Sequence, residues 1–290
     1  MEKIINNSIY IKAKDHLVTQ EDFTIITTNI NGLLKTTPTP SSSEIGKYYQ
    51  SENYISHTDS KKTFIDKIYQ IVKSYSLKKK YDLLKKNHPE AKTVLDIGSG
   101  TGDLISYCKK GFECYGTEPN LQARELSIKK GNKVVEKIED LPLKKYDIIM
   151  MWHVLEHVHD LDYQLSSIYE MLNENGILII AVPNYNSYDA TYYKEDWAAY
   201  DVPRHLWHFN KSAMKTVLKN KNIFVVKILP LIFDSFYVSI LSEKIKRGTS
   251  NLINAFFIGL KSNWKAKSSG EYSSLIYISK KGNKNEFKAI

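Results

Sequence analysis

The chain has 290 residues, 42% of them hydrophobic, and a formal net charge of +9. This length suits one α/β domain with additions, and the apolar content is enough for a sizeable core. Two cysteines, Cys108 and Cys114, cannot build a disulfide framework, so we expect two buried thiols and a reducing, cytoplasmic location. The longest apolar stretch, 228–241, is broken by Asp234 and is too short to span a bilayer.

The positive charge comes mainly from lysines, with short runs at 78–80, 85–86 and 109–110. Attraction to nucleic acid or to an anionic membrane is one explanation of such a charge. Because the lysines are scattered and no nucleic-acid motif accompanies them, we favour a solvated surface and expect no nucleic-acid partner.

Residues 1–60 alternate only weakly and contain the turn-rich stretch 36–43, so we predict an irregular N-terminal extension. A helix is predicted over 61–86, where apolar residues recur at spacings of three and four. From residue 92 onward strands and helices alternate, and Asn120 and Asn210 are typical N-caps of two of the helices. The predicted strands are 92–97, 112–117, 133–137, 146–152, 176–182, 223–229 and 273–280.

Short apolar strands separated by helices predict a Rossmann-like α/β fold, with seven strands in a mostly parallel sheet and helices on both faces. We assign this domain to residues 61–290, with its core at 92–229. Right-handed crossovers place the carboxyl ends of parallel strands at one edge, where ligands bind.

Two segments go beyond this scheme. Residues 183–209 are crowded with aromatic side chains and follow a strand end, so we predict an aromatic lid over the substrate pocket. Residues 231–269 predict two amphipathic helices before the final strand 273–280. We favour packing over the sheet edge for these helices. A lid, a homodimer contact and a peripheral membrane contact are the alternatives, and a monomer is equally open.

The stretch VLDIGSGTGD is the strongest functional signal. An apolar strand leads into Asp96, then Gly98, Gly100 and Gly102 alternate with small polar residues, and Glu118 follows Gly98 by twenty positions. Glycine lets a ligand approach bare backbone, and a carboxylate at that distance binds ribose hydroxyls in nucleotide folds. The pattern therefore predicts a site for an adenosine-containing cofactor.

A dinucleotide-dependent oxidoreductase is the less favoured alternative. The dinucleotide fingerprint would place its third glycine where Asp103 stands. The carboxylate of Asp96 would also repel a pyrophosphate, whereas it suits an ammonium or sulfonium group.

Together with Glu118-Pro119-Asn120, the glycine pattern resembles the first motifs of the class I S-adenosylmethionine-dependent methyltransferases. The stretch LEHV at 155–158 and the segments 172–184 and 201–209 are similar to small-molecule methyltransferases, including those of ubiquinone biosynthesis. The resemblance covers 92–229 and implies S-adenosylmethionine as cofactor and an antiparallel last strand. It further implies methyl transfer to a small-molecule acceptor, with oxygen favoured over nitrogen or carbon.

The same resemblance implies the cofactor-binding residues. Asp96 would orient the amino group, Glu118 would hold both ribose hydroxyls, and Pro119 would pack on the adenine. The remaining members are Gly98, Ser99, Gly100 and Gly102 along the methionine moiety, Ile138 at the adenine, Trp152 near the methionine moiety, and His57 as a cover. Ordinary packing is the alternative for His57. Lys137 stands where the family often has an acidic residue for the adenine amine, so that contact would fall to Glu139 or Asp140.

His153, Glu156 and His157 match H-x-x-E-H, a zinc-protease motif with two histidines on one helix face. That motif needs a helix running through it and a third ligand, whereas here it begins where a buried strand ends. We therefore predict no metal site and keep zinc hydrolysis as a disfavoured alternative.

Methyl transfer is a displacement at a sulfonium carbon, so the protein mainly aligns the reactants and excludes water. A hydroxyl nucleophile benefits from a general base, and His153, His157 and His205 are the predicted catalytic residues. A structural role is the alternative for each of the three.

Trp197, Tyr200 and Arg204 are the predicted substrate-binding residues. Arg204 either binds a substrate carboxylate or phosphate through its planar fork or pairs with Asp201. A catalytically inactive cofactor-binding interaction protein remains open, because only turnover would distinguish it. Nucleic-acid methylation is disfavoured, since residues 152–155 lack the Pro-Pro motif of amino-group methylases.

Overall fold

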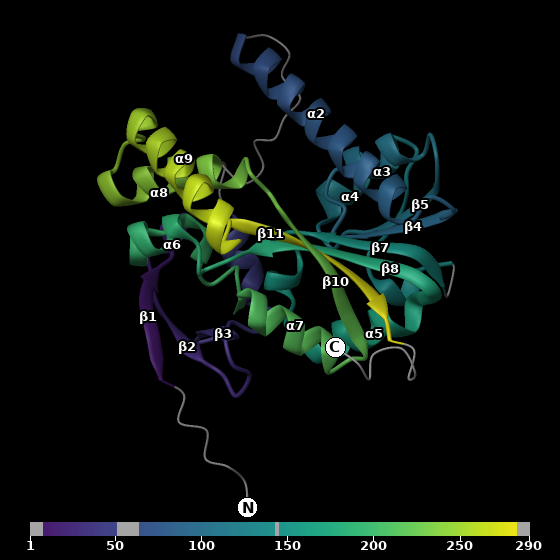
Figure 1. The fold of residues 1–290 in the computed structure, drawn as a ribbon, viewed down its shortest axis with the longest axis horizontal. Helices are drawn as coiled ribbons and strands as arrows, with labels where there is room; N and C mark the ends of the chain where they lie inside the picture. The colour runs from purple at the N-terminus through teal and green to yellow at the C-terminus, as the bar shows by residue number, and fades with distance from the viewer. Residues whose placement is uncertain (1–7, 51–63, 143–144, 283–290) are drawn as a thin grey trace, which may run out of the picture.

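A computed structural model describes residues 8–50, 64–142 and 145–282. Seven strands form one sheet in the order β10-β11-β8-β7-β4-β5-β6 (Figure 1). Their bounds are β4 (Thr93–Ile97), β5 (Glu113–Thr117), β6 (Lys133–Val135), β7 (Tyr146–Trp152), β8 (Leu172–Pro183), β10 (Ile223–Pro230) and β11 (Ser274–Lys281). Neighbours from β8 to β6 are parallel, while β11 is antiparallel to both β8 and β10. The predicted fold class, the seven strands and the antiparallel last strand are confirmed.

The fifth of these strands, β8, begins at Leu172, earlier than the predicted residue 176. Leu172 pairs with Tyr146, and the next pair joins Ile177 to Ile148, so the residues between bulge out of the ladder. Both Leu172 and Tyr146 are fully buried. The strand therefore starts where Leu172 is buried opposite Tyr146. The sequence does not indicate this start, because Asn173 and Asn175 are typical of a turn.

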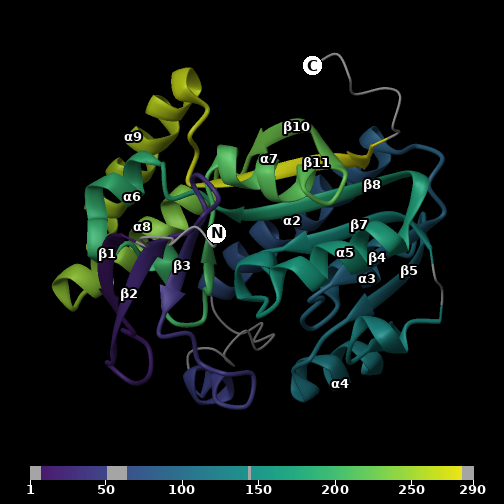
Figure 2. The ribbon, with the colours of Figure 1, turned by 90° about the horizontal axis from the view of Figure 1, so that it is seen from below.

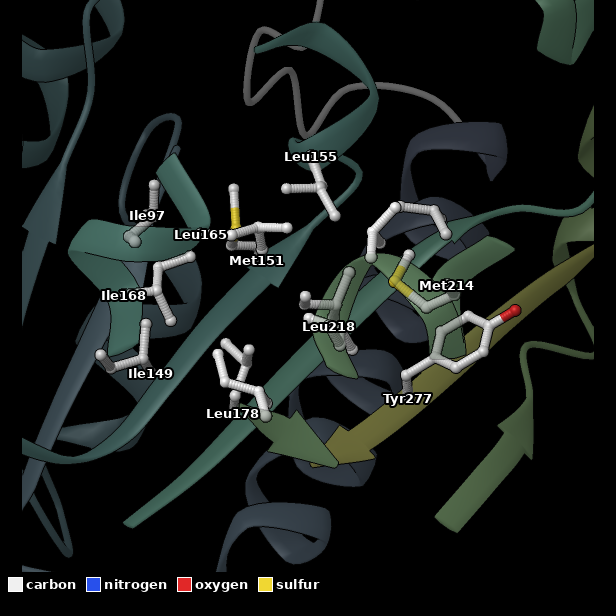
Figure 3. Packing of buried hydrophobic residues seen from close by; sticks show 14 of the residues in the cluster. Ile97, Ile149, Met151, Leu155, Leu165, Ile168, Leu178, Met214, Leu218 and Tyr277 are labelled. Atoms are coloured by element: carbon white, nitrogen blue, oxygen red, sulfur yellow. The ribbon is translucent and has the colours of Figure 1, made fainter. Parts of the chain in front are cut away.

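Helices cover both faces of this sheet. α5 (Leu161–Met171) and α7 (Lys211–Lys219) lie on one face, and α2 (Phe64–Asn87) and α3 (Asp103–Cys108) on the other. Side chains alternate along a strand, so Leu95 packs with the first pair of helices and its neighbour Val94 with the second. Figure 3 shows the first layer, in which Leu165, Ile168, Met214 and Leu218 lie against Ile149, Met151 and Leu178. Full burial of each such side chain stabilises the fold by about 1.5–3 kcal/mol.

The predicted helix caps and buried thiols are confirmed. Asn120 caps α4 (Leu121–Lys129) by accepting a hydrogen bond from the Ala123 amide at 3.0 Å, and Asn210 caps α7 in the same way. Each cap of this kind is worth about 1 kcal/mol. Cys108 and Cys114 are both free and buried.

The prediction of an irregular N-terminal extension is wrong for residues 9–37. Strands β1 (Ile9–Lys14), β2 (Asp22–Thr27) and β3 (Leu34–Thr37) form an antiparallel sheet, completed by β9 (Trp207–His208). Phe23 and Ile25 alternate inward and are buried, which is the period-two signal of a half-buried strand. The boundary predicted at residue 60 therefore separates segments that share one sheet. A short helix, η1 (Ile45–Tyr49), follows.

The aromatic segment 183–209 lies against this small sheet (Figure 2). It contains α6 (Tyr188–Tyr193), η4 (Lys194–Asp196) and η5 (Ala198–Tyr200). Its buried side chains Tyr185, Tyr193, Trp197 and Tyr200 form one cluster with Phe23, Ile25 and Leu34 of the small sheet. The aromatic residues therefore form a second buried core, which does not fit the predicted lid over a substrate pocket.

The two helices predicted within 231–269 are confirmed as α8 (Asp234–Arg247) and α9 (Leu252–Ser269). Both figures of the whole chain show them side by side, next to α6 and at the end of the molecule far from β4 and β5 (Figures 1 and 2). Among the described residues, no helix has the length and apolarity that crossing a membrane requires.

Candidate functional site

The glycine loop joins the carboxyl end of β4 to α3, and all three of its glycines have left-handed backbones. Their φ values are +71° at Gly98, +55° at Gly100 and +74° at Gly102. A Cβ would lie 2.5 Å from a Val154 methyl at Gly98 and 1.9 Å from the Ser127 hydroxyl at Gly102, but would meet nothing within 4 Å at Gly100. Gly98 and Gly102 thus allow close packing, whereas Gly100 presents open backbone to a ligand.

Glu118 lies at the carboxyl end of β5 and is directed at this loop. The Gly100 N–H donates to one carboxylate oxygen at 2.7 Å, and the Asn120 N–H donates to the other at 2.9 Å. The side chain is mostly buried, and Pro119 follows it directly. Since a carboxylate has about four lone-pair positions, two remain for hydroxyl donors of a ligand.

Asp96, near the carboxyl end of β4, is buried close to two charged groups. Burial raises the pKa of Asp96 to about 7; the Lys80 ammonium opposes this rise, and the Glu118 carboxylate adds to it. Burial also lowers the pKa of Lys80, whose Nζ lies 4.2 Å from the centre of the Trp152 ring. A cationic ligand at this position would restore the Asp96 carboxylate.

Lys80 is the residue that the sequence analysis missed, because it belongs to the run 78–80 assigned to a solvated surface. The missed signal is helical spacing: Lys80 follows Leu77 by three positions and precedes the fully buried Leu84 by four. This places it on the inward face of α2.

The remaining cofactor predictions are placed only in part. Ser99 lies in the loop with a buried hydroxyl that has no hydrogen-bond partner among the described residues. Trp152 ends β7 beside Lys80, and Ile138 begins η2 (Ile138–Asp140), half-buried against the core. Of the two residues expected at the adenine amine, Glu139 accepts a hydrogen bond from Tyr163. His57 lies outside the described residues.

His153 follows β7 with a φ of +56°, an uncommon conformation for a side-chain-bearing residue. Its Nδ1 lies 3.3 Å from Glu156, and its Nε2 lies 3.1 Å from Asp234 at the start of α8. Burial alone would lower the pKa of His153, but the hydrogen bonds to Asp234 and Glu156 raise it to about 10. The predicted role of general base does not fit, because an imidazolium has no free lone pair.

His157 lies in η3 (Leu155–His157) and is neutral. Its Nδ1 donates to the Arg204 carbonyl at 3.0 Å, which leaves Nε2 unprotonated. Burial lowers the pKa of His157 to about 4, with the nearby His205 adding to the effect. His157 is therefore a weak base at neutral pH, and its hydrogen bond supports the structural alternative.

His205 packs edge-on against His157, with ring centres 4.6 Å apart. Its Nδ1 donates to the Ala199 carbonyl at 2.8 Å. Glu156, His157 and His205 each offer one ligand atom, and these atoms lie within 4.8 Å of one another. Both Glu156 oxygens are buried, and one of them lies 3.3 Å from His153 Nδ1. Within the described ranges, these three residues are the group of side chains that could hold a metal ion. The group shares Glu156 and His157 with the H-x-x-E-H motif but contains His205 in place of His153.

The predicted substrate-binding residues lie in the second core instead of facing an open pocket. Arg204 is 1% exposed and donates to Asp15, Asp201 and the Tyr48 carbonyl. The Trp197 indole donates to Asp189, and Tyr200 is buried. The cavity that Trp197, Tyr200 and Arg204 line is ≈ 20 Å³, room for about one water. Substrate contact by these three does not fit this placement, and Arg204 pairs with Asp201, the structural alternative.

A larger cavity of ≈ 560 Å³ opens between β2, β3, α5 and α7. Its walls include Ile30, Leu33, Leu165 and Trp207, with Lys35 among the polar residues. None of the described cofactor-site residues lines it, so it is separate from the glycine loop.

The strand order and the glycine loop facing Glu118 define a protein with the class I methyltransferase fold. A family model described as a methyltransferase domain matches residues 67–228. The chain therefore belongs to this methyltransferase family, and the predicted resemblance is confirmed.

Two curated relatives and two solved structures are similar to parts of the chain. The ubiquinone biosynthesis O-methyltransferases of Pelagibacter ubique and Rhodopseudomonas palustris (strain TIE-1) are 31% identical over 100 residues and 32% identical over 108 residues. These matches cover 31% and 33% of this chain, and only 42% of either relative's length.

The structure of a possible histamine N-methyltransferase from Thermotoga maritima matches with a TM-score of 0.51 and 19% identity, over 75% of this chain and 96% of that one. The magnesium protoporphyrin IX methyltransferase of Synechocystis PCC 6803 matches with a TM-score of 0.51 and 14% identity, over 78% and 90%. These two likenesses establish the fold.

Proposed function

We propose that this protein is an S-adenosylmethionine-dependent methyltransferase that methylates an oxygen of a small-molecule acceptor. The observation that carries the proposal is the open backbone of Gly100, whose N–H donates to the Glu118 carboxylate, with the buried Asp96 carboxylate near enough to Glu118 to interact electrostatically. Membership of the methyltransferase family and the names of the curated relatives support it.

The residues at the glycine loop fit this cofactor. Glu118 has two lone-pair positions for the ribose hydroxyls, and the space at Gly100 admits the methionine portion. The pKa of Asp96 is about 7, so a bound cation beside it would make the carboxylate fully ionised at neutral pH. The cofactor supplies an electrophilic methyl group on a positively charged sulfur.

The protein's own contribution is alignment and exclusion of water rather than strong base catalysis. His153 is already protonated and His157 is only weakly basic. An acceptor oxygen that ionises easily, as in a phenol or a carboxylic acid, is therefore favoured over an alkyl alcohol.

Calorimetric titration with S-adenosylmethionine and, in parallel, NADH tests the cofactor. We expect binding of the methyl donor alone, weakened about tenfold or more in Gly100→Ala because the added methyl fills the ligand's space. Gly248→Ala is the matched control, since Gly248 also has a positive φ (+75°) and open space but lies after α8. Preference for NADH, or equal loss in both variants, would contradict the proposal.

Turnover tests the reaction. Release of S-adenosylhomocysteine is measured with a panel of phenols, carboxylic acids, alkyl alcohols and amines. Methylation of phenols or carboxylic acids supports the proposal. Methylation of amines alone would show that the acceptor atom is nitrogen and not oxygen. Tight cofactor binding without any turnover would favour an inactive interaction protein.

A further inference from the structure

Helix α9 carries its large apolar residues on the outside. It buries a face made mostly of small residues, Ala255, Gly259, Ser262 and Ala266 among them. It exposes Leu252, Ile253, Phe256, Phe257, Leu260 and Trp264, with Ile253 74% and Trp264 64% exposed. These positions repeat at the helical period and so form one continuous stripe. The hydrophobic effect favours the opposite arrangement in water, so this stripe requires a partner that shields it.

Helix α8 follows the same plan. Its buried face includes Ser235, Ser239 and Ser242, while Tyr237 and the preceding Phe233 are exposed. The two helices approach closely, because a Cβ at Gly259 would lie 3.0 Å from the Phe236 Cα. Small residues at a close helix–helix contact, with large apolar residues facing outward, are the packing that lipid surroundings favour.

The exposed charges of this hairpin, residues 231–270, are all basic. They are Lys244, Lys246, Arg247, Lys261, Lys265 and Lys267, all exposed. The two acidic residues of the segment are engaged: Asp234 pairs with His153, and the fully buried Glu243 pairs with Arg247. Lys261 and Lys265 border the apolar stripe and lie near the Tyr188 ring.

We propose that the α8–α9 hairpin docks on an anionic membrane surface, with its apolar stripe among the acyl chains and its basic residues at the lipid phosphates. Aromatic and aliphatic residues beside lysines are the composition of a helix that lies in the interface plane. A second copy of this chain fits less well, because symmetric contact would bring like charges together. The hairpin lies in that plane, since no described helix meets the requirements for crossing a bilayer.

The start of α8 links this hairpin to residues beside the candidate site, although most of the hairpin lies away from β4 and β5. Asp234 opens α8 and holds His153, and Phe233 packs edge-on against Tyr75 of α2, whose Lys80 neighbours Asp96. Docking does not depend on methyl transfer, so it is tested without any methyl donor or acceptor.

Vesicle flotation of the full chain is the first experiment. Vesicles of phosphatidylglycerol and phosphatidylcholine in equal parts are compared with pure phosphatidylcholine, with and without added NaCl. We expect flotation with the anionic vesicles, weaker flotation with the neutral ones, and loss of the difference at high salt. Trp264 serves as an internal probe: its emission should shift to the blue on binding and be quenched by brominated lipid, and Trp264→Phe should remove this signal.

Two variants separate the apolar and the charged contributions. Phe256→Ser with Phe257→Ser should lower partitioning on anionic vesicles by about a hundredfold or more, whereas Ile9→Ser, an exposed apolar residue on β1, should not. Lys261→Gln, Lys265→Gln and Lys267→Gln together should lower it by about a hundredfold, while the exposed Lys215, Lys219 and Lys227 changed to Gln leave it within about threefold. Unchanged circular dichroism and thermal midpoints identify variants that remain folded.

Absence of flotation with anionic vesicles, or no change in Trp264 emission, would overturn the proposal. Equal losses in the hairpin variants and their matched controls would also overturn it. A homodimer by light scattering that the Phe256/Phe257 double variant dissociates, without vesicle binding by the wild type, would assign the stripe to a second copy instead.

Discussion

The two halves of the sheet's carboxyl edge are built differently. At β4 and β5, backbone and carboxylates are left available: Gly100 faces open space, and the pKa of Asp96 is about 7. After β7 and β8, the histidines already have partners within the protein: His153 lies between two carboxylates, and His157 and His205 each donate to a backbone carbonyl.

This difference between the two halves indicates which side chains are available to bind a ligand. A buried carboxylate whose charge is poorly compensated gains stabilisation when a cationic ligand arrives. A histidine whose charge is already paired, or whose ring N–H already donates to the protein, gains little from a ligand and instead holds its surroundings in place. The glycine loop is therefore the binding half, and the histidines mainly fix the neighbouring loop.

The largest expected effect is on the histidine half. His153→Asn keeps a residue that accepts positive φ but leaves Glu156 without its imidazolium. We expect the free energy of unfolding to fall by about 3 kcal/mol, discounted because the His153 ring is partly exposed. Because the pKa of His153 is raised, the stabilisation from its positive charge is fully present below pH 6.5 and is lost as the pH rises through about 10.

Denaturant titrations of wild type and variant across this pH range measure the difference. The exposed His159→Asn serves as control and should stay within about 0.5 kcal/mol of wild type. A difference that does not shrink with rising pH would show that His153 contributes through packing alone.

On the binding half, Glu118→Gln should weaken S-adenosylmethionine binding by about thirtyfold, or ~2 kcal/mol, through loss of charged hydrogen bonds to the ribose. Calorimetry measures the affinity. Glu136→Gln is the control, because Glu136 is a more exposed carboxylate that pairs with Arg124. Equal affinities of wild type and Glu118→Gln would rule out the ribose contact.

A smaller effect is expected from pH. Asp96 is protonated below a pKa of about 7 and ionised above it, and only the ionised form attracts a cation. The affinity for S-adenosylmethionine should therefore fall by about tenfold for each pH unit below this pKa, at most, with proton release on binding. Calorimetry in buffers of different ionisation enthalpy measures the proton. Asp96→Asn should bind weakly at every pH, and a pH dependence that survives in this variant would assign the titration elsewhere.

The smallest expected effect concerns His157. His157→Asn can keep the donor to the Arg204 carbonyl while losing the free Nε2. We expect a stability loss of about 1 kcal/mol and a kcat within about threefold of wild type. Steady-state turnover decides: a fall of about a hundredfold or more would make His157 the general base and would remove the contrast between the two halves.

Much of the fold was predictable because its signals are local. Strands β4 to β7 are recognisable in the sequence as short apolar runs, and the helix caps Asn120 and Asn210 bond to residues within one turn. The glycine spacing predicted the loop that the structure places against Glu118. The partners of the histidines could not be predicted, because Asp234 lies eighty-one positions beyond His153 and nothing in the local sequence connects them.

The sequence by itself determined the seven-stranded α/β core, the glycine loop and the ribose-binding carboxylate candidate, since period, spacing and turn chemistry are properties of neighbouring residues. Only the tertiary structure decided which charges are satisfied. It buried Arg204 against Asp15, turned His153 into an imidazolium, and placed Lys80 beside Asp96. It also turned the large residues of α9 outward. Burial and distant partners set these properties, because the energy of a charge or an apolar side chain depends on what surrounds it.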